Sequence, residues 1–288
     1  MHVFDDTPCE LGEGPLWHPV NQKLYWFDIL KSSLFCKASN GTETQQWHFD
    51  ENVSAAGWID EQHLLIASQS ALFIFNLLTH QQQFVCDLEA DKPLNRSNDG
   101  RADPYGGFWI GTMGYDAQPK AGAIYRYYRG ELRKLVSDIT ITNAICFSPD
   151  KRFAYYTDTA EQIIWRQGLN QDDGWPTGEP EIYLDLTEPN LNPDGAVIDV
   201  QGNMWVAQWG AARIAQYSPN GEFMQAVEVP TEHSTCPAFG GSNLQRLFIT
   251  TSKAWLSPSE AASQPAGQTF YSDLDCVGVA EPSVNIAV

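Results

Sequence analysis

The chain has 288 residues, of which 43% are hydrophobic and 12% aromatic, so it can bury a core and is not intrinsically disordered. Its 36 acidic and 17 basic residues give a formal net charge of −19. This charge repels nucleic acid, and no run of Lys and Arg offers a local exception, which excludes a nucleic-acid-binding protein.

The sequence predicts neither an N-terminal signal peptide nor a membrane span. The first ten residues have neither the basic nor the apolar region of a signal peptide. The longest apolar runs are far below the roughly 20 residues that a membrane span needs. The six cysteines are scattered without a CxxC pair, which favours free thiols over a zinc knuckle or a disulfide framework. We therefore expect a cytoplasmic protein that does not associate with membranes.

In chain order, one pattern recurs six times: a small or acidic residue, a short apolar run, a polar turn and an aromatic-rich strand. The six units begin at Glu13, Ser54, Asn98, Asn143, Asp194 and Cys236. In each unit the second strand carries an equivalent large side chain. From one unit to the next, these side chains are 39 to 50 residues apart in the sequence. They are Trp26, Leu65, Trp109, Tyr155, Trp205 and Phe248.

Each unit also contains further alternating segments, such as SLFCKAS and AIYRYYR, which bring it to about four short strands. A repeat of this length built from four strands is typical of a propeller blade. We predict an all-β fold, a six-bladed β-propeller with four antiparallel strands per blade, as a single domain over residues 1–288. A β-sandwich or a pair of smaller β domains is disfavoured, because the spacing is regular and no Pro/Ser-rich linker interrupts it.

The residue that enters the inner strand of each unit points toward the propeller axis. Four of the six units place an acidic or amide side chain there: Glu13, Asn98 or its neighbour Asp99, Asn143 and Asp194. Asn and Asp also favour turns, so each one alone has a second interpretation. Together, their oxygens suit one hard divalent cation, Ca²⁺, Mn²⁺ or Mg²⁺. No His lies on this ring, so Zn²⁺ is a weaker candidate.

Other kinds of catalytic site are disfavoured. The sequence contains no GxSxG elbow and no phosphate-binding glycine motif. His233 precedes the sixth inner strand and is a candidate for a supporting position behind the channel. Trp209 and Tyr115 are candidates for an apolar wall, and each has blade packing as its alternative.

Five segments together carry a family resemblance, and it runs from about residue 9 to residue 250. They are LGEGPLW (11–17), NRSNDGRADPYGGFWIGTMG (95–114), ITNAICFSPD (141–150), NPDGAVIDVQGNMWVA (192–207) and CPAFGG (236–241). The chain resembles the SMP-30/gluconolactonase/regucalcin family, whose members are six-bladed propellers with one divalent metal ion in the channel.

The resemblance implies a role for each residue of the site. Glu13, Asn143 and Asp194 would be the metal ligands, and Asp194 would also act as the catalytic base. On the substrate side, Arg96 and Asn98 would hydrogen-bond sugar hydroxyls, with Asp99 bracing their loop. The segment 114–122 is shorter than the substrate-binding lid of vertebrate members and offers Lys120 to the substrate, with a solvated loop lysine as the alternative.

The expected activity is therefore that of a lactonase, a carboxylic ester hydrolase. It would hydrolyse a sugar lactone, such as glucono-1,5-lactone or L-arabinono-1,4-lactone, to the aldonic acid. A non-sugar lactone or organophosphate ester is an alternative substrate, and a non-catalytic calcium-binding regulatory propeller is the alternative outside enzymes. We expect a small molecule as the partner, and a monomer or weak homodimer.

Overall fold

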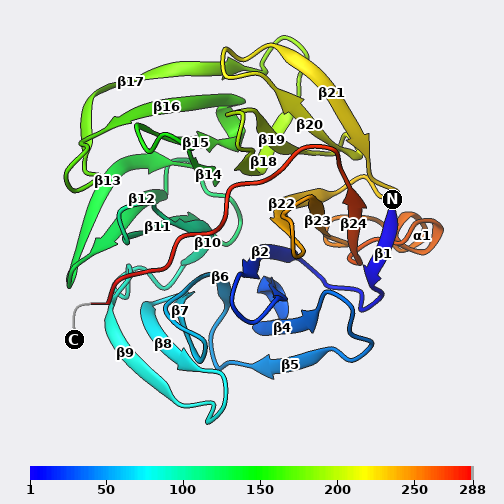
Figure 1. Cartoon of the computed structure of the whole chain (residues 1–288), viewed down its shortest axis with the longest axis horizontal. Helices are drawn as coiled ribbons and strands as arrows, with labels where there is room; N and C mark the ends of the chain where they lie inside the picture. The colour runs from blue at the N-terminus through cyan, green and yellow to red at the C-terminus, as the bar shows by residue number, and fades with distance from the viewer. Residues whose placement is uncertain (287–288) are drawn as a thin grey trace.

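The computed structural model describes residues 1–286, whose strands form six four-stranded antiparallel sheets around a central axis (Figure 1). The all-β, six-bladed propeller predicted from the repeat is confirmed. The only α-helix among the described residues is α1 (Pro258–Ser263), beside two single 3₁₀ turns, η1 (Ile29–Lys31) and η2 (Thr159–Glu161). No helix of this part of the chain has the length and apolar character needed to cross a membrane.

Blades 1 to 3 follow one another along the chain, and each runs from the axis outward. Blade 1 consists of β2 (Gly12–His18), β3 (Lys23–Asp28), β4 (Ser33–Ala38) and β5 (Gln45–His48). Blade 2 consists of β6 (Val53–Trp58), β7 (His63–Ser68), β8 (Ala71–Asn76) and β9 (Gln82–Asp87). Blade 3 consists of β10 (Asn95–Ala102), β11 (Phe108–Gly114), β12 (Gly122–Tyr128) and β13 (Glu131–Ile139).

Blade 6 closes the ring with strands from both ends of the chain. Blade 4 consists of β14 (Thr142–Phe147), β15 (Phe153–Asp158), β16 (Ile163–Leu169) and β17 (Pro176–Asp185). Blade 5 consists of β18 (Asn192–Ile198), β19 (Met204–Trp209), β20 (Arg213–Tyr217) and β21 (Phe223–Glu228). Blade 6 consists of β22 (Ser234–Gly240), β23 (Arg246–Thr251), β24 (Thr269–Asp273) and β1 (His2–Asp5). Backbone hydrogen bonds between β1 and β24 join the two ends.

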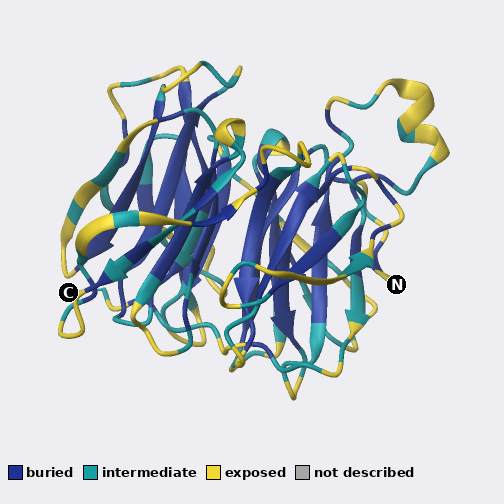
Figure 2. Cartoon of the chain, turned by 90° about the horizontal axis from the view of Figure 1, so that it is seen from above, coloured by how far each residue is buried: buried dark blue, intermediate teal, exposed yellow. Residues whose placement is uncertain are grey.

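The core lies between neighbouring blades, because each sheet buries both faces against the next. Trp17 and Trp26 of blade 1, for example, pack against Phe248 of blade 6. The inner strands are buried along their length, whereas the outermost strands, such as β9 and β21, are largely exposed (Figure 2). Burial of the inner strands fixes the direction in which each of their side chains points, and this direction sets the geometry of the channel.

Two positions in the predicted repeat are wrong by one residue. Leu65, Trp109, Tyr155, Trp205 and Phe248 all pack toward the following blade. Trp26 packs back toward blade 6, and Tyr25, which is paired with Leu16, takes the equivalent place in blade 1.

The second correction concerns blade 6. After the irregularity in each inner strand, Leu16 pairs with Tyr25 in blade 1 and Ala238 pairs with Phe248 in blade 6. The residue three positions before Leu16 is Glu13, and the residue three positions before Ala238 is Thr235. Thr235, and not Cys236, is therefore the equivalent of Glu13 in blade 6. Both errors have one cause, since the turns between the first two strands differ in length and a shift of one residue reverses the face of a strand.

The last described residues form a strap across one face of the ring, residues 274–286 (Figure 1). The N–H of Val200 in blade 5 donates to Val277, and the indole of Trp58 in blade 2 donates to the carbonyl of Glu281 at 2.9 Å. Val284 is buried in the core between blades 2 and 3. This C-terminal strap therefore connects opposite sides of the propeller.

Candidate active site

Each inner strand has an irregular register near its start, where a bulge redirects the side chains. In β2 the pairing shifts between Glu13 and Leu16, and in β14 it shifts between Asn143 and Cys146. The residue after Glu13 is Gly14, with φ of 53°, and a Cβ there would lie 2.1 Å from the carbonyl oxygen of Ser54. Glycine is required at this position so that Glu13 can enter the channel.

Carboxylates at the ends of the second strands hold the segments that lead into the channel. Asp28, which ends β3, accepts hydrogen bonds from the backbone N–H groups of Glu10 and Leu11 at 2.7 and 3.1 Å. Asp158, which ends β15, accepts equivalent bonds at 2.7 and 3.0 Å from the two residues before Thr142. The approach to Glu13 and the approach to Asn143 are thus fixed by the same device.

These strands surround a cavity of about 570 Å³ at one end of the channel. Five predicted site residues line it together: Glu13, Arg96, Asn98, Asn143 and Asp194. All five are buried. The structure therefore brings together, at one place, side chains that are up to 181 residues apart in the chain (Glu13 to Asp194).

Glu13 and Asp194 are two buried carboxylates, and burial together with a neighbouring carboxylate raises the pKa of each. Burial, together with the charge of Asp99, raises the pKa of Glu13 to about 8. Burial and the charge of Glu13 raise the pKa of Asp194 well above its usual range. Arg96 is the cation near both, and burial lowers the pKa of its guanidinium to about 10. Two carboxylates with so little compensation favour the entry of a divalent cation between them.

A chain of hydrogen bonds orients the amides beside these carboxylates. Arg96 Nη1 donates to Asn98 Oδ1 at 2.7 Å, and Asn98 Nδ2 lies 3.1 Å from Asn143 Oδ1. Asn143 Nδ2 donates in turn to Thr159 Oγ1 at 2.9 Å. In this arrangement each amide oxygen accepts one hydrogen bond, Asn98 Oδ1 from Arg96 and Asn143 Oδ1 from Asn98. An amide oxygen has two lone pairs, so Asn143 Oδ1 has one left for a cation.

The donor set fits a hard cation better than zinc. Within residues 1–286, no group of three or more His, Cys, Asp and Glu side chains is arranged to hold a metal ion. Glu13, Asn143 and Asp194 instead offer two carboxylates and one amide oxygen, and Ca²⁺, Mn²⁺ and Mg²⁺ accept such oxygen ligands.

Arg96 has a donor left for a ligand. Its Nε is buried and has no hydrogen-bond partner among the described residues. Arg96 lines the cavity, so this unpaired buried donor lies beside the predicted site.

Two predicted substrate residues do not line the cavity. Asp99 is buried behind it, where its Oδ2 accepts a hydrogen bond of 2.7 Å from the N–H of Ile145. Lys120 is exposed, and its backbone N–H donates to Thr140 Oγ1 at 3.2 Å. From the same segment 114–122, the residues that reach the cavity are Tyr115, Asp116 and Ala117.

The mouth of the cavity carries an aromatic cluster. His233 does not line the cavity but stacks on Trp209, which does, with ring centroids 3.9 Å apart and an interplanar angle of 14°. Trp255 stands nearly at right angles to Trp209, at 70°, with centroids 5.8 Å apart. Trp209 and His233 were candidates from the sequence, whereas Trp255 was not predicted, and its signal is a lone Trp in the polar stretch TSKAWLSPSE.

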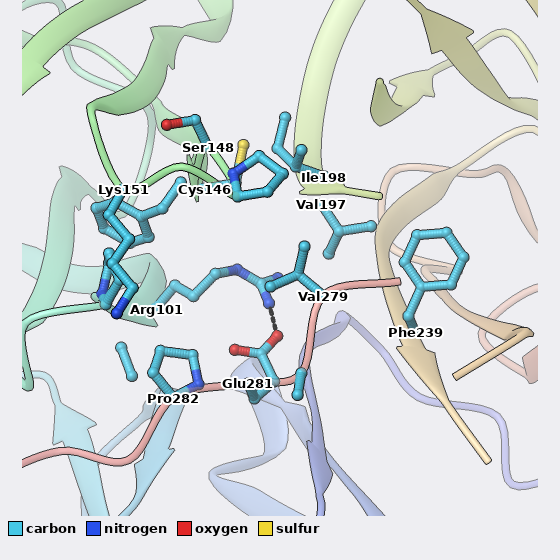
Figure 3. Close-up of a pocket in the computed structure, with 15 residues that line it drawn as sticks. Arg101, Cys146, Ser148, Lys151, Val197, Ile198, Phe239, Val279, Glu281 and Pro282 are labelled. Carbon is cyan, nitrogen blue, oxygen red and sulfur yellow. Dashed lines mark hydrogen bonds and ion pairs between the residues drawn. The ribbon is translucent and has the colours of Figure 1, made fainter. Parts of the chain in front are cut away.

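The opposite end of the channel is closed by the C-terminal strap. Arg101 of β10 forms an ion pair there with Glu281 of the strap (Figure 3). The Arg101 side chain also donates to the backbone carbonyls of Ile145 and Ala196 at 3.2 and 3.4 Å. A smaller cavity of about 250 Å³, with Cys146 among its lining residues, lies beside this pair.

Comparison with known proteins places the chain in a family. The sequence profile of the SMP-30/gluconolactonase/LRE-like region matches residues 11–253. The chain belongs to this family, which confirms the resemblance seen in the sequence.

Two curated relatives and one crystal structure are similar over almost their whole lengths. The putative sugar lactone lactonase of Rhizobium meliloti is 36% identical, with 99% of this chain and 97% of that protein covered. The 6-deoxy-6-sulfogluconolactonase of Pseudomonas putida is 30% identical, with 96% and 95% covered. The crystal structure of a calcium-binding protein, regucalcin, from Agrobacterium tumefaciens is 37% identical, with a TM-score of 0.97 and with 99% and 97% covered.

Proposed function

We propose that this protein is a lactonase that hydrolyses a sugar lactone with the help of one divalent cation held by Glu13, Asn143 and Asp194. The observation that carries the proposal is the pair of buried carboxylates in a cavity that also offers an unpaired arginine donor. The names of the relatives, a sugar lactone lactonase and a sulfogluconolactonase, support the reaction class. Glucono-1,5-lactone and L-arabinono-1,4-lactone are the substrates to test first.

The reaction adds water to the lactone carbonyl carbon and breaks the ring C–O bond, which gives a hydroxy acid. When bound, a divalent cation polarises the carbonyl and acidifies water. Asp194 accepts the proton that the attacking water loses and returns it to the departing ring oxygen. Arg96 places a positive charge beside the substrate, and its Nη1 holds Asn98 in place. Asn98 and Thr159 hold the Asn143 amide in one orientation through hydrogen bonds to its oxygen and its nitrogen.

A calcium-binding role without catalysis is the second candidate, because the similar crystal structure is described as that of a calcium-binding protein. The same oxygen ligands would serve it. The two functions differ in whether a lactone is turned over.

Proton release from glucono-1,5-lactone and L-arabinono-1,4-lactone, followed with and without EDTA, tests the proposal. We expect turnover that EDTA abolishes and that Mn²⁺ or Ca²⁺ restores, and we expect Asp194→Asn to lower kcat by a factor of roughly 100 or more. Asp185→Asn is the matched control, since Asp185 is an exposed carboxylate on β17. A protein that binds the cation but hydrolyses neither lactone would instead be the calcium-binding alternative.

A further inference from the structure

Trp255 is an exposed aromatic residue in an uncommon backbone conformation at the mouth of the cavity. Its side chain and backbone together are 67% exposed, although an indole is one of the largest apolar groups available for a core. Its φ is 63°, in the left-handed region that bulky residues rarely occupy. Strained residues of this kind persist where the surrounding structure holds them, and they concentrate at ligand-binding positions.

The surrounding backbone holds Trp255 firmly. The N–H groups of Lys253 and Ala254 both donate to the carbonyl of Glu10, at 3.2 and 2.9 Å. The carbonyl of Ala254 lies 3.1 Å from His233 Nδ1. On the other side, Ser257 caps α1 with a hydrogen bond from the N–H of Glu260. The indole is therefore held in the open by a fixed turn, where it contributes little to the core.

The faces of the two tryptophans at the mouth are not equivalent. His233 covers one face of Trp209 by stacking at 3.9 Å. Trp255 meets Trp209 with an interplanar angle of 70°, so the two indoles form a corner. Since Trp255 lines the cavity and is largely exposed, it has a free face for a ligand. A sugar ring presents C–H groups on one side, and an indole face is a suitable surface for them.

The charges around the cavity indicate which sugars it accepts. Arg96 is the only cationic side chain among the described residues that line the cavity, and it is buried beside Glu13 and Asp194. Nearer the solvent, the charged lining residue is Asp116, which is exposed. A phosphate, sulfonate or carboxylate on the outer part of the sugar would meet this carboxylate, and none of the described lining residues there is a cation.

We propose that Trp255 is a specificity-determining residue whose indole stacks on the apolar face of an uncharged sugar lactone. This inference rests on the proposed lactonase function and deepens it. It assigns the outer half of the substrate site to Trp255 and the inner half to Arg96 and the carboxylates.

Steady-state kinetics of the full chain with its cation tests the stacking. For Trp255→Ala, we expect KM for glucono-1,5-lactone to rise about 5- to 20-fold with kcat within twofold, because stacking contributes equally to the ground state and the transition state. Trp255→Phe should restore most of the loss, and cation affinity should not change. Phe84→Ala, which removes an exposed aromatic on the outer strand β9, is the matched control.

The substrate class has its own test. We expect kcat/KM of the unsubstituted protein for glucono-1,5-lactone to exceed that for its 6-phosphate by at least tenfold. An unchanged KM in Trp255→Ala, no recovery in Trp255→Phe, or a preference for the phosphorylated lactone would each overturn this inference while leaving the lactonase function standing. Absence of all lactone turnover in the unsubstituted protein would overturn the proposed function and this inference with it.

Discussion

The chemistry of the site depends on residues whose ionisation is set by burial. Glu13 and Asp194 are buried together, and each has a pKa above its usual range because water is excluded and carboxylates lie close to one another. Residue types were enough to predict an oxygen-rich ring, because acids and amides recur at equivalent positions of the repeat. The hydrogen bonds that turn Asn98 toward Arg96 were beyond sequence analysis, since they depend on side-chain directions that only the packed channel defines.

The raised pKa of Glu13 predicts how stability depends on pH without metal. An ordinary Glu in the unfolded chain ionises near pH 4.3, whereas Glu13 in the folded protein does so near 8. Between these two pH values Glu13 keeps its proton in the folded state and has lost it in the unfolded state. The contribution of Glu13 to the free energy of unfolding therefore falls as pH rises. Thermal denaturation in EDTA from pH 5 to 9 measures this pH dependence of stability. Saturating Mn²⁺ or Ca²⁺ should abolish the pH dependence.

Glu13→Gln provides the control for this pH dependence. It keeps the size of the side chain and cannot ionise, so the difference in melting temperature between Glu13→Gln and the unsubstituted metal-free protein should grow toward pH 8. A difference that is constant across the range, or that shrinks with pH, would contradict the raised pKa.

At the scale of the strand, the repeat predicted which segments form sheets and missed some details of register. Strong alternation and tight turns defined the blades, because each sheet buries both faces against its neighbours. The same alternation makes an error of one residue reverse a face, and this affected Trp26 and Cys236. Turns between first and second strands vary in length, and sequence alone does not give the position of a bulge.

Loops were predicted less well than strands, because their side-chain directions depend on single tertiary contacts. In the segment 114–122, Lys120 was the expected substrate contact, but the residue anchored at the cavity is Tyr115. Its hydroxyl lies 2.5 Å from Asn52 Oδ1 and 2.8 Å from Gln69 Oε1, both in or beside blade 2. This contact between blades 2 and 3 holds the loop beside the mouth.

Tyr115→Phe should therefore loosen this loop without disturbing the blades. We expect a loss of about 0.5–1.5 kcal/mol in the free energy of unfolding, the usual contribution of one hydrogen bond, together with faster amide exchange in residues 115–121. Urea denaturation and hydrogen exchange measure the two effects. Tyr105→Phe, which removes a hydroxyl bonded to the Lys151 carbonyl at 2.9 Å, is the matched control and should leave exchange in this loop unaltered.

Considered as a whole, the ring is closed twice. Strand β1 pairs with β24 and joins the two ends of the chain within blade 6. The C-terminal strap then crosses the ring and inserts Glu281 at the end of the channel opposite the mouth. Neither closure could be predicted from the repeat, because β1 lies outside the six units and the strap has no strand pattern. The strap also lies beyond the family match, which ends at residue 253.

The ion pair between Arg101 and Glu281 makes the strap's contribution measurable. Both side chains are largely buried, with 11% and 9% exposure, so Glu281→Ala leaves the Arg101 charge without its partner. Removing one partner of a buried pair costs about 3–5 kcal/mol, so we expect a clear fall in the free energy of unfolding by urea. Glu281→Gln, which keeps the shape and a hydrogen-bond acceptor, should lose less of this free energy, and Glu179→Ala on the exposed strand β17 should lose almost none.

If Glu281→Ala were as stable as Glu179→Ala, the ion pair between Arg101 and Glu281 would not hold the strap in place. Strands β1 and β24 still close blade 6 in all three variants, so the β-sheet circular dichroism spectrum should persist. The fall in the free energy of unfolding then measures the contribution of the strap alone.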